Sequence, residues 1–347
     1  MKIQAYIYHK RAEKYSDCQD YFGIQSQNNR IAVSDGMSQS IYPQWWAEIL
    51  VEAYLNTGKI PGSLDELQKY QDVWQDRVQN EILKRENNGK NPWRLKNSFM
   101  EKSGAGATLC GFTWNDNSWS CECIGDTSLI VVRNDFSIEI KSSQEGEFGN
   151  HPDYLDSFQK GRGDVKSLSG EFDDVFTILL VTDPFAELFQ KYRHDVKFIE
   201  ERISEINSLS DHESYSKLVE EWRDEYFMHN DDSTLIVLTD FTSNELQYYH
   251  IDNLKDLIRK ESPNSMLSIS GVNNSSQTVS LKQQTSNCNG TSKICPTKEE
   301  ERQRTIEEFR RASQNLLKYY IYKRNQREIL KFFKRYLNEV IKNFCKK

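Results

Sequence analysis

Four aspartates lie beside short segments of apolar and β-branched residues. Asp35 follows "RIAVS", Asp183 follows "TILLVT", and Asp231 precedes "STLIVLT" with one residue between them. Asp20 directly precedes "YFGI". If these segments are neighbouring strands, the four carboxylates converge at one edge of a sheet, where protons or a metal must neutralise them. Ligation by oxygen alone favours hard cations, so the pattern predicts a site for Mg²⁺ or Mn²⁺.

Gly36 follows the central aspartate of this set. Glycine has no side chain, so its backbone can approach a bound ion closely. We therefore expect Asp35 to hold a metal and Gly36 to lend its carbonyl oxygen.

Composition limits the class of protein. The 347 residues suit one large domain with appendages, and the net charge of −7 argues against a dedicated nucleic-acid binder. The seven cysteines are odd in number and scattered without a CxxC pair. The beginning "MKIQAYIYHK" lacks the apolar stretch of a signal peptide, and no window of eighteen apolar residues exists. We expect a reducing, cytoplasmic location.

Periodicity predicts an α+β fold. Alternation and β-branched content indicate strands at 2–8, 30–34, 174–183, 231–241 and 246–252, with several more between 106 and 140. Helical spacing of apolar residues predicts helices at 45–55 and 64–87 and helical structure over 185–226. Strand runs and helix runs follow each other without a repeated βαβ unit, which favours α+β.

Composition divides the chain into three parts: a domain over 1–261, a linker over 262–298 and a tail over 299–347. In the linker, Ser, Asn and Gln fill 17 of 37 positions. The apolar residues that remain are too few for their burial to offset the entropy lost on ordering the segment. The tail has apolar residues at helical spacing, and its last 30 residues carry a net charge of +8. It is predicted to be a basic amphipathic helix or helical hairpin that docks a protein partner. The alternatives are autoinhibitory folding back onto the domain, contact with an anionic membrane, and plain packing as a solvated helix.

The acidic positions belong to an ordered series of motifs. After Asp20 come "VSDGM" (33–37), "GAGATL" (104–109), "CIGDTSLIVVR" (123–133), "LLVTD" (179–183) and "NDDSTLIVL" (230–238). This series over about residues 1–245 resembles the metal-dependent protein phosphatases, the PPM or type 2C family, and in particular a bacterial branch linked to signalling.

The resemblance implies a fold of two packed antiparallel β-sheets flanked by helices, an αββα sandwich to which the helical tail is added. It implies that Asp35 bridges two Mg²⁺ or Mn²⁺ ions, helped by Asp20 and the Gly36 carbonyl, and that Asp183 and Asp231 complete the pair. Asp126 and Glu187 match positions that bind a third ion in some members. The implied reaction is hydrolysis of phosphoserine or phosphothreonine on proteins by metal-activated water.

The chain also departs from the family pattern. An arginine that often holds phosphate is replaced by Tyr15, with Lys14 adjacent, so Lys14 is the candidate phosphate-binding residue. Pro184 replaces a usual glycine and stiffens its turn. These departures leave an alternative open, a pseudophosphatase or regulatory scaffold that binds a phosphoprotein or another partner without turnover.

Other residues have plainer interpretations. An acid after glycine also makes a turn, which is the alternative for Asp126. Cys121 and Cys123 are predicted to share one face of a strand, but two sulfurs do not close a zinc site, so packing is the expected role. His229 is two residues before Asp231, so a place near the site is one interpretation of it, and a structural role is the expected one.

Overall fold

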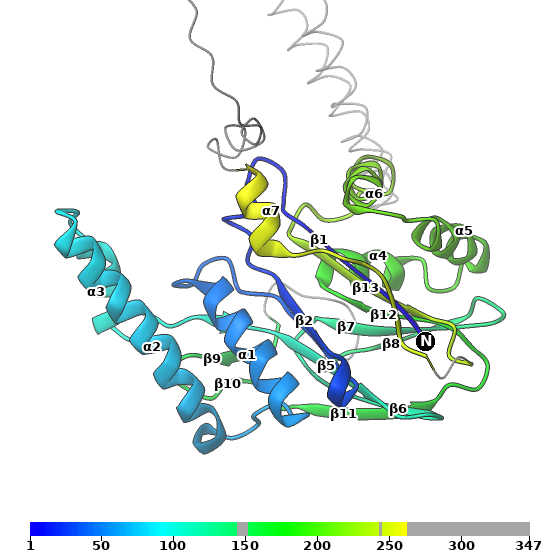
Figure 1. Ribbon diagram of the computed structural model, residues 1–347, viewed down its shortest axis with the longest axis horizontal. Helices are drawn as coiled ribbons and strands as arrows, with labels where there is room; N and C mark the ends of the chain where they lie inside the picture. The colour runs from blue at the N-terminus through cyan, green and yellow to red at the C-terminus, as the bar shows by residue number, and fades with distance from the viewer. Residues whose placement is uncertain (144–151, 243–244, 262–347) are drawn as a thin grey trace, which may run out of the picture. The chain divides into compact units, whose positions relative to one another are not determined.

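The computed structural model describes residues 1–143, 152–242 and 245–261. In its larger sheet, the amino-terminal strand pairs with two strands from late in the chain, one on each side (Figure 1). In spatial order the strands are β14 (Gln247–Ile251), β1 (Lys2–Tyr8), β13 (Ser233–Thr239), β12 (Val175–Val181), β7 (Ser128–Arg133) and β8 (Ile138–Lys141). All neighbours are antiparallel except β1 and β14, which are parallel.

The second sheet is antiparallel and is built mainly from the middle of the chain. Its order is β11 (Lys166–Glu171), β6 (Ser118–Ile124), β5 (Leu109–Trp114), β3 (Arg30–Ser34) and β2 (Tyr21–Gln25). A 3₁₀ turn, Ser26–Asn28, joins β2 to β3. A small third sheet contains β10 (Gly161–Arg162), β9 (Tyr154–Asp156) and β4 (Gly106–Ala107).

The two large sheets pack face to face. Alternate residues of each strand point inward, as the two-residue period of a strand requires. The inner layer is apolar and combines Ile3, Ile178 and Leu180 of the first sheet with Val33 and Phe112 of the second, all buried. This layer brings the ends of strands from both sheets close together.

Helix α1 (Pro43–Thr57) covers the outer face of the second sheet, and α2 (Leu64–Asn87) packs beside α1 (Figure 1). Proline at the first turn suits the start of α1, and Gly58, with φ +73°, ends it. A capping box between Ser63 and Glu66 begins α2. The short α3 (Trp93–Met100) follows α2.

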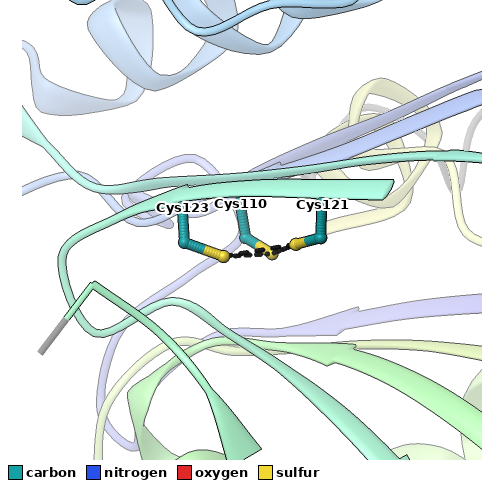
Figure 2. Close-up of side chains that lie close together, drawn as sticks. All are labelled: Cys110, Cys121 and Cys123. Atoms are coloured by element: carbon teal, nitrogen blue, oxygen red, sulfur yellow. Dashed lines mark hydrogen bonds between the residues drawn. The ribbon is translucent and has the colours of Figure 1, made fainter. Parts of the chain in front are cut away.

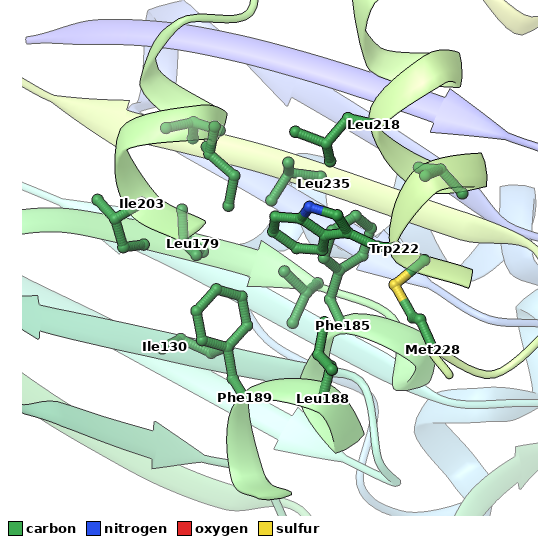
Figure 3. Close-up of a cluster of buried hydrophobic side chains, with 14 of the residues drawn as sticks. Ile130, Leu179, Phe185, Leu188, Phe189, Ile203, Leu218, Trp222, Met228 and Leu235 are labelled. Atoms are coloured by element: carbon green, nitrogen blue, oxygen red, sulfur yellow. The ribbon is translucent and has the colours of Figure 1, made fainter. Parts of the chain in front are cut away.

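Helices α4 (Asp183–Lys191), α5 (Val196–Asn207) and α6 (His212–Glu225) cover the outer face of the first sheet. Figure 3 shows Trp222 of α6 among Phe185 and Phe189 of α4 and aliphatic side chains of the strands. Burying these large side chains fixes α4 against the sheet, and α4 begins with Asp183. Helix α7 (Leu254–Glu261) packs Leu257 against Ile7 and Tyr15.

The predicted α+β sandwich is confirmed. The helix at 64–87 has the predicted bounds, whereas the helical stretch 185–226 is divided into α4, α5 and α6 by two turns. Strands β2, β9, β10 and β11 and helices α3 and α7 were not predicted. The linker and tail, 262–347, lie outside the described residues, so their predictions stay untested. Among the residues described, none of the helices combines the length and apolar character needed to span a bilayer.

Candidate metal centre

Strand pairing in the second sheet places Asp20 beside Asp35. Tyr21 pairs with Ser34 across β2 and β3, so the residue before β2 lies opposite the residue after β3. The Asp35 backbone is held by the residue between β4 and β5, because its carbonyl accepts from the Thr108 N–H at 2.9 Å. The first two acids therefore meet at one end of the second sheet.

The first sheet brings the other acids to the same place. Val181 pairs with both Ser128 and Leu235, so the end of β12 lies beside the beginnings of β7 and β13. Asp183 follows β12, Asp126 precedes β7 and Asp231 precedes β13. Three chain segments thus deliver one carboxylate each, as the strand-end pattern predicts.

Asp20 connects the two sheets. Its side chain is fully buried, and its Oδ2 accepts hydrogen bonds from the hydroxyls of Thr182 at 3.0 Å and Thr234 at 2.7 Å. The hydroxyls belong to the ends of β12 and β13, whereas Asp20 precedes β2. This link anchors the two halves of the cluster to each other.

Three buried carboxylate oxygens in the cluster lack a hydrogen-bond partner among the described residues: Oδ1 of Asp20, of Asp126 and of Asp183. A buried carboxylate oxygen without a donor is costly, and a bound cation would remove that cost. The donor set consists of hard oxygens, which fits Mg²⁺ or Mn²⁺.

The carboxylates of the cluster repel one another. Burial raises the pKa of Asp20 and of Asp35 well above the ordinary range, and neighbouring carboxylates, among them Asp183, raise both further. Burial, with the charge of Asp183, raises the pKa of Asp126 to about 7. Burial also raises that of Asp183, against the favourable contact with His229. The protein alone therefore favours protons here, and a divalent ion would compete with them.

Gly36 lies where no side chain fits. A Cβ at this position would meet the Gln19 carbonyl oxygen at 2.9 Å and Pro43 Cβ at 2.8 Å. Gly36 also forms an antiparallel bridge to Ala107. The glycine therefore allows β4, α1 and the segment before Asp20 to close around Asp35.

The loop that carries Asp231 is held by two basic residues. Lys10 Nζ lies 3.1 Å from Asp231 Oδ1 and 3.2 Å from Ser38 Oγ. Burial disfavours the charged Lys10, but Asp231 and nearby acids raise its pKa overall. Arg223 of α6 donates to the Asp231 carbonyl at 2.6 Å. Sequence reasoning missed Lys10, because its approach depends on pairing β1 with β13.

His229 lies at the rim of the same cluster. Its Nδ1 is 3.7 Å from Asp183 Oδ2, and single ligand atoms of Asp183, His229 and Asp231 all lie within 4.8 Å of one another. The side chain is 57% exposed. The structure thus places an imidazole beside the carboxylates, which is the alternative to a purely structural role that the sequence left open.

The two departures around phosphate binding have clear structural settings. Tyr15 is buried in the α7 cluster, with its hydroxyl 2.5 Å from His212 Nε2. Lys14 is exposed, and its side chain forms no hydrogen bond or ion pair with the described residues. Lys10, by contrast, contacts the carboxylate of Asp231 directly.

Pro184 and Glu187 belong to α4. Pro184 lies in the first turn, where its missing N–H has no partner to lose, so it supports the helix start at Asp183. Glu187 is one turn further along, and its charge contributes to the raised pKa of Asp126. The two predicted third-ion residues are therefore close enough to interact, across the gap between α4 and the turn before β7.

Comparison with known proteins finds one matching family model. A family model described as protein phosphatase 2C matches residues 9–223, well over half of the chain. No match is found among curated proteins.

Similar solved structures include the serine/threonine phosphatase Stp1 from Staphylococcus aureus, with 13% identity and a TM-score of 0.43, covering 69% of this chain and 94% of that one. PstP/Ppp from Mycobacterium tuberculosis has 14% identity, a TM-score of 0.41 and coverages of 68% and 96%. PppA from Pseudomonas aeruginosa has 16% identity, a TM-score of 0.39 and coverages of 68% and 95%.

Proposed function

This chain belongs to the protein phosphatase 2C family of metal-dependent phosphatases, and from that premise we propose that it hydrolyses phosphoserine and phosphothreonine on cytoplasmic proteins with Mg²⁺ or Mn²⁺. The observation that carries the proposal is the convergence of Asp20, Asp35, Asp126 and Asp183 with three unpartnered buried carboxylate oxygens.

The residues have separate roles in this proposal. Asp35 and the Gly36 carbonyl would hold two ions together, with Asp20 helping and with Asp183 and Asp231 completing the pair. Asp126 and Glu187 would hold a third ion. When bound, these ions lower the pKa of a water molecule and neutralise charge on the phosphoryl oxygens.

The chain's own groups prepare this centre. The hydroxyls of Thr182 and Thr234 orient Asp20, and Arg223 fixes the backbone of the Asp231 loop. Lys10 supplies positive charge beside Asp231, where it can favour an approaching phosphate monoester. Such preorganised charge acts without reorganisation during the reaction.

Turnover of p-nitrophenyl phosphate and of phosphoserine and phosphothreonine peptides tests the proposal. We expect turnover with Mn²⁺ or Mg²⁺, loss on chelation, and recovery when metal is restored. Asp35→Asn should reduce kcat at least a hundredfold, because the bridging carboxylate loses its charge. Asp17→Asn is the matched control, since Asp17 is an exposed carboxylate three residues before Asp20.

One observation favours the alternative of a scaffold without turnover. Lys10 already pairs with Asp231, so an ammonium group partly neutralises the cluster without a metal. A protein of this kind would bind a phosphoprotein but show no metal-dependent turnover. Binding of a phosphopeptide by both the wild type and Asp35→Asn, with hydrolysis by neither, would establish that alternative.

A further inference from the structure

Three cysteines meet in the core, and none of them has a role in the hydrolysis proposed above. Cys110 of β5 pairs directly with Cys123 of β6, and Cys121 lies two residues earlier on the same face of β6. Figure 2 shows the three side chains pointing the same way from the second sheet. Their sulfurs are 3.3 Å (Cys121–Cys123), 3.4 Å (Cys110–Cys123) and 3.5 Å (Cys110–Cys121) apart.

We propose that Cys110, Cys121 and Cys123 form a binding site for one soft, thiophilic metal cation of the Cu⁺ or Zn²⁺ class. Ordinary packing of cysteine as a small apolar residue does not require three sulfurs to close a triangle. In this triangle every sulfur contacts both others, so a single ion can reach all three. Thiolate sulfur selects Cu⁺ and Zn²⁺ over Mg²⁺ or Mn²⁺.

The size of the triangle fits such an ion. With metal–sulfur bonds of about 2.3 Å, an ion equidistant from the three sulfurs would sit about 1.2 Å out of their plane. This pyramidal position leaves one side open for a fourth ligand. The Lys141 carbonyl oxygen lies 3.9 Å from Cys123 Sγ.

Charge in the core also favours a cation. Hydrogen bonding with Cys110 and with Cys121 lowers the pKa of the Cys123 thiol, whereas the pKa of each of the other two thiols is raised. None of the hydrogen bonds and ion pairs among the described residues brings a basic side chain to these sulfurs. A thiolate here lacks a counter-charge. A bound cation would supply positive charge, and the thiol protons that it displaces would leave to solvent.

Burial determines how the metal enters. The three cysteines are 0%, 1% and 0% exposed, between the two sheets. Exchange with the folded protein is therefore slow, and loading accompanies folding, as metal binding and folding are coupled. The test consequently loads the metal during refolding of the full chain.

The experiment uses the full chain with Cys288, Cys295 and Cys345 replaced by serine, so that Cys18 is the only other thiol. The protein is refolded under reducing conditions with Cu⁺, with Zn²⁺ or without metal, and then freed of excess metal. Metal content and X-ray absorption are measured. We expect one ion per chain with three sulfur neighbours at about 2.3 Å, and a higher Tm in the loaded protein.

Variants separate this site from other thiols and from the carboxylates. Cys110→Ala and Cys121→Ala should each lose the sulfur-bound ion and the rise in Tm. Cys18→Ala, which removes a buried thiol outside the triangle, should retain both. Asp35→Asn should leave the sulfur-bound ion unchanged, even if it loses Zn²⁺ bound by oxygen.

The result is decisive in either direction. Retention of Cu⁺ alone or of Zn²⁺ alone would support the site and identify its metal. The proposal would be overturned if neither ion gave a sulfur-coordinated species. It would also be overturned if Cys110→Ala and Cys121→Ala gave the same sulfur signal as the protein with all three cysteines.

Discussion

At the scale of single residues, the centre depends on buried carboxylates that repel one another and on a position, Gly36, where no side chain fits. The carboxylates of Asp20, Asp35 and Asp183 have raised pKa values because they are buried together. Lys10 offsets part of this charge through Asp231. These contacts distinguish Lys10 from the exposed Lys14, which sequence alone suggested for phosphate binding.

Replacing Lys10 tests which lysine serves the substrate. Lys10→Met removes the charge beside Asp231 while keeping side-chain length, and we expect kcat/KM for p-nitrophenyl phosphate to fall on the order of tenfold to a hundredfold. Lys14→Met should change it less than twofold. A larger loss in Lys14→Met would return the phosphate-binding role to Lys14.

Gly36 offers a second test at this scale. In Gly36→Ala the new Cβ would press on the Gln19 carbonyl and Pro43, and we expect about 1–3 kcal/mol of lost stability in urea unfolding. Gly62→Ala is the control, because the nearest atom to its added Cβ is a Val165 methyl at 3.7 Å. Equal stability of the two variants would show that the close approach around Gly36 is not needed.

At the scale of elements, the site is produced by the ends of strands. The apolar segments before Asp35 and Asp183 and after Asp231 are strongly patterned, so their strands and the position of each acid at a strand end could be predicted from sequence. Pairing partners could not, because register depends on contacts between distant segments. For this reason the sequence revealed neither Lys10 beside Asp231 nor Cys110 beside Cys123.

The hydroxyls of Thr182 and Thr234 form a clamp on Asp20, which gives a prediction for β12 and β13. Thr234→Val removes the shorter of the two hydrogen bonds to this buried carboxylate. We expect about 1–3 kcal/mol of lost stability together with weaker Mn²⁺ binding in calorimetry. Thr177→Val, which removes a hydroxyl bond to the Leu238 carbonyl elsewhere on β12, should lose stability without weakening Mn²⁺ binding. If both variants bind Mn²⁺ equally, the clamp has no part in the centre.

At the scale of the whole molecule, the acid cluster links folding stability to pH and metal. The unfolded chain ionises its aspartates near pH 4, whereas Asp126 in the folded protein ionises at about pH 7. Between these values the folded state retains a proton that the unfolded state releases, so stability falls as pH rises. The titration of Asp126 therefore makes the metal-free protein less stable at pH 7.5 than at pH 5.5.

Thermal unfolding at several pH values measures this linkage. We expect the Tm of metal-free protein to rise between pH 7.5 and 5.5, to rise less in Asp126→Asn, and to rise as in the wild type in Asp17→Asn. Saturating Mn²⁺ should cancel or reverse the rise, because the metal competes with protons for the same oxygens. An identical pH profile with and without Mn²⁺ would contradict the linkage.

Direct titration of metal-free full chain with Mn²⁺ by calorimetry tests the central claim, that carboxylates from separate strands hold divalent ions together. The account predicts at least two ions per chain, release of protons on binding at pH 6.5, and loss of the tighter binding in Asp35→Asn but not in Asp17→Asn. Absence of Mn²⁺ binding, or the same isotherm for Asp35→Asn and the wild type, would contradict it.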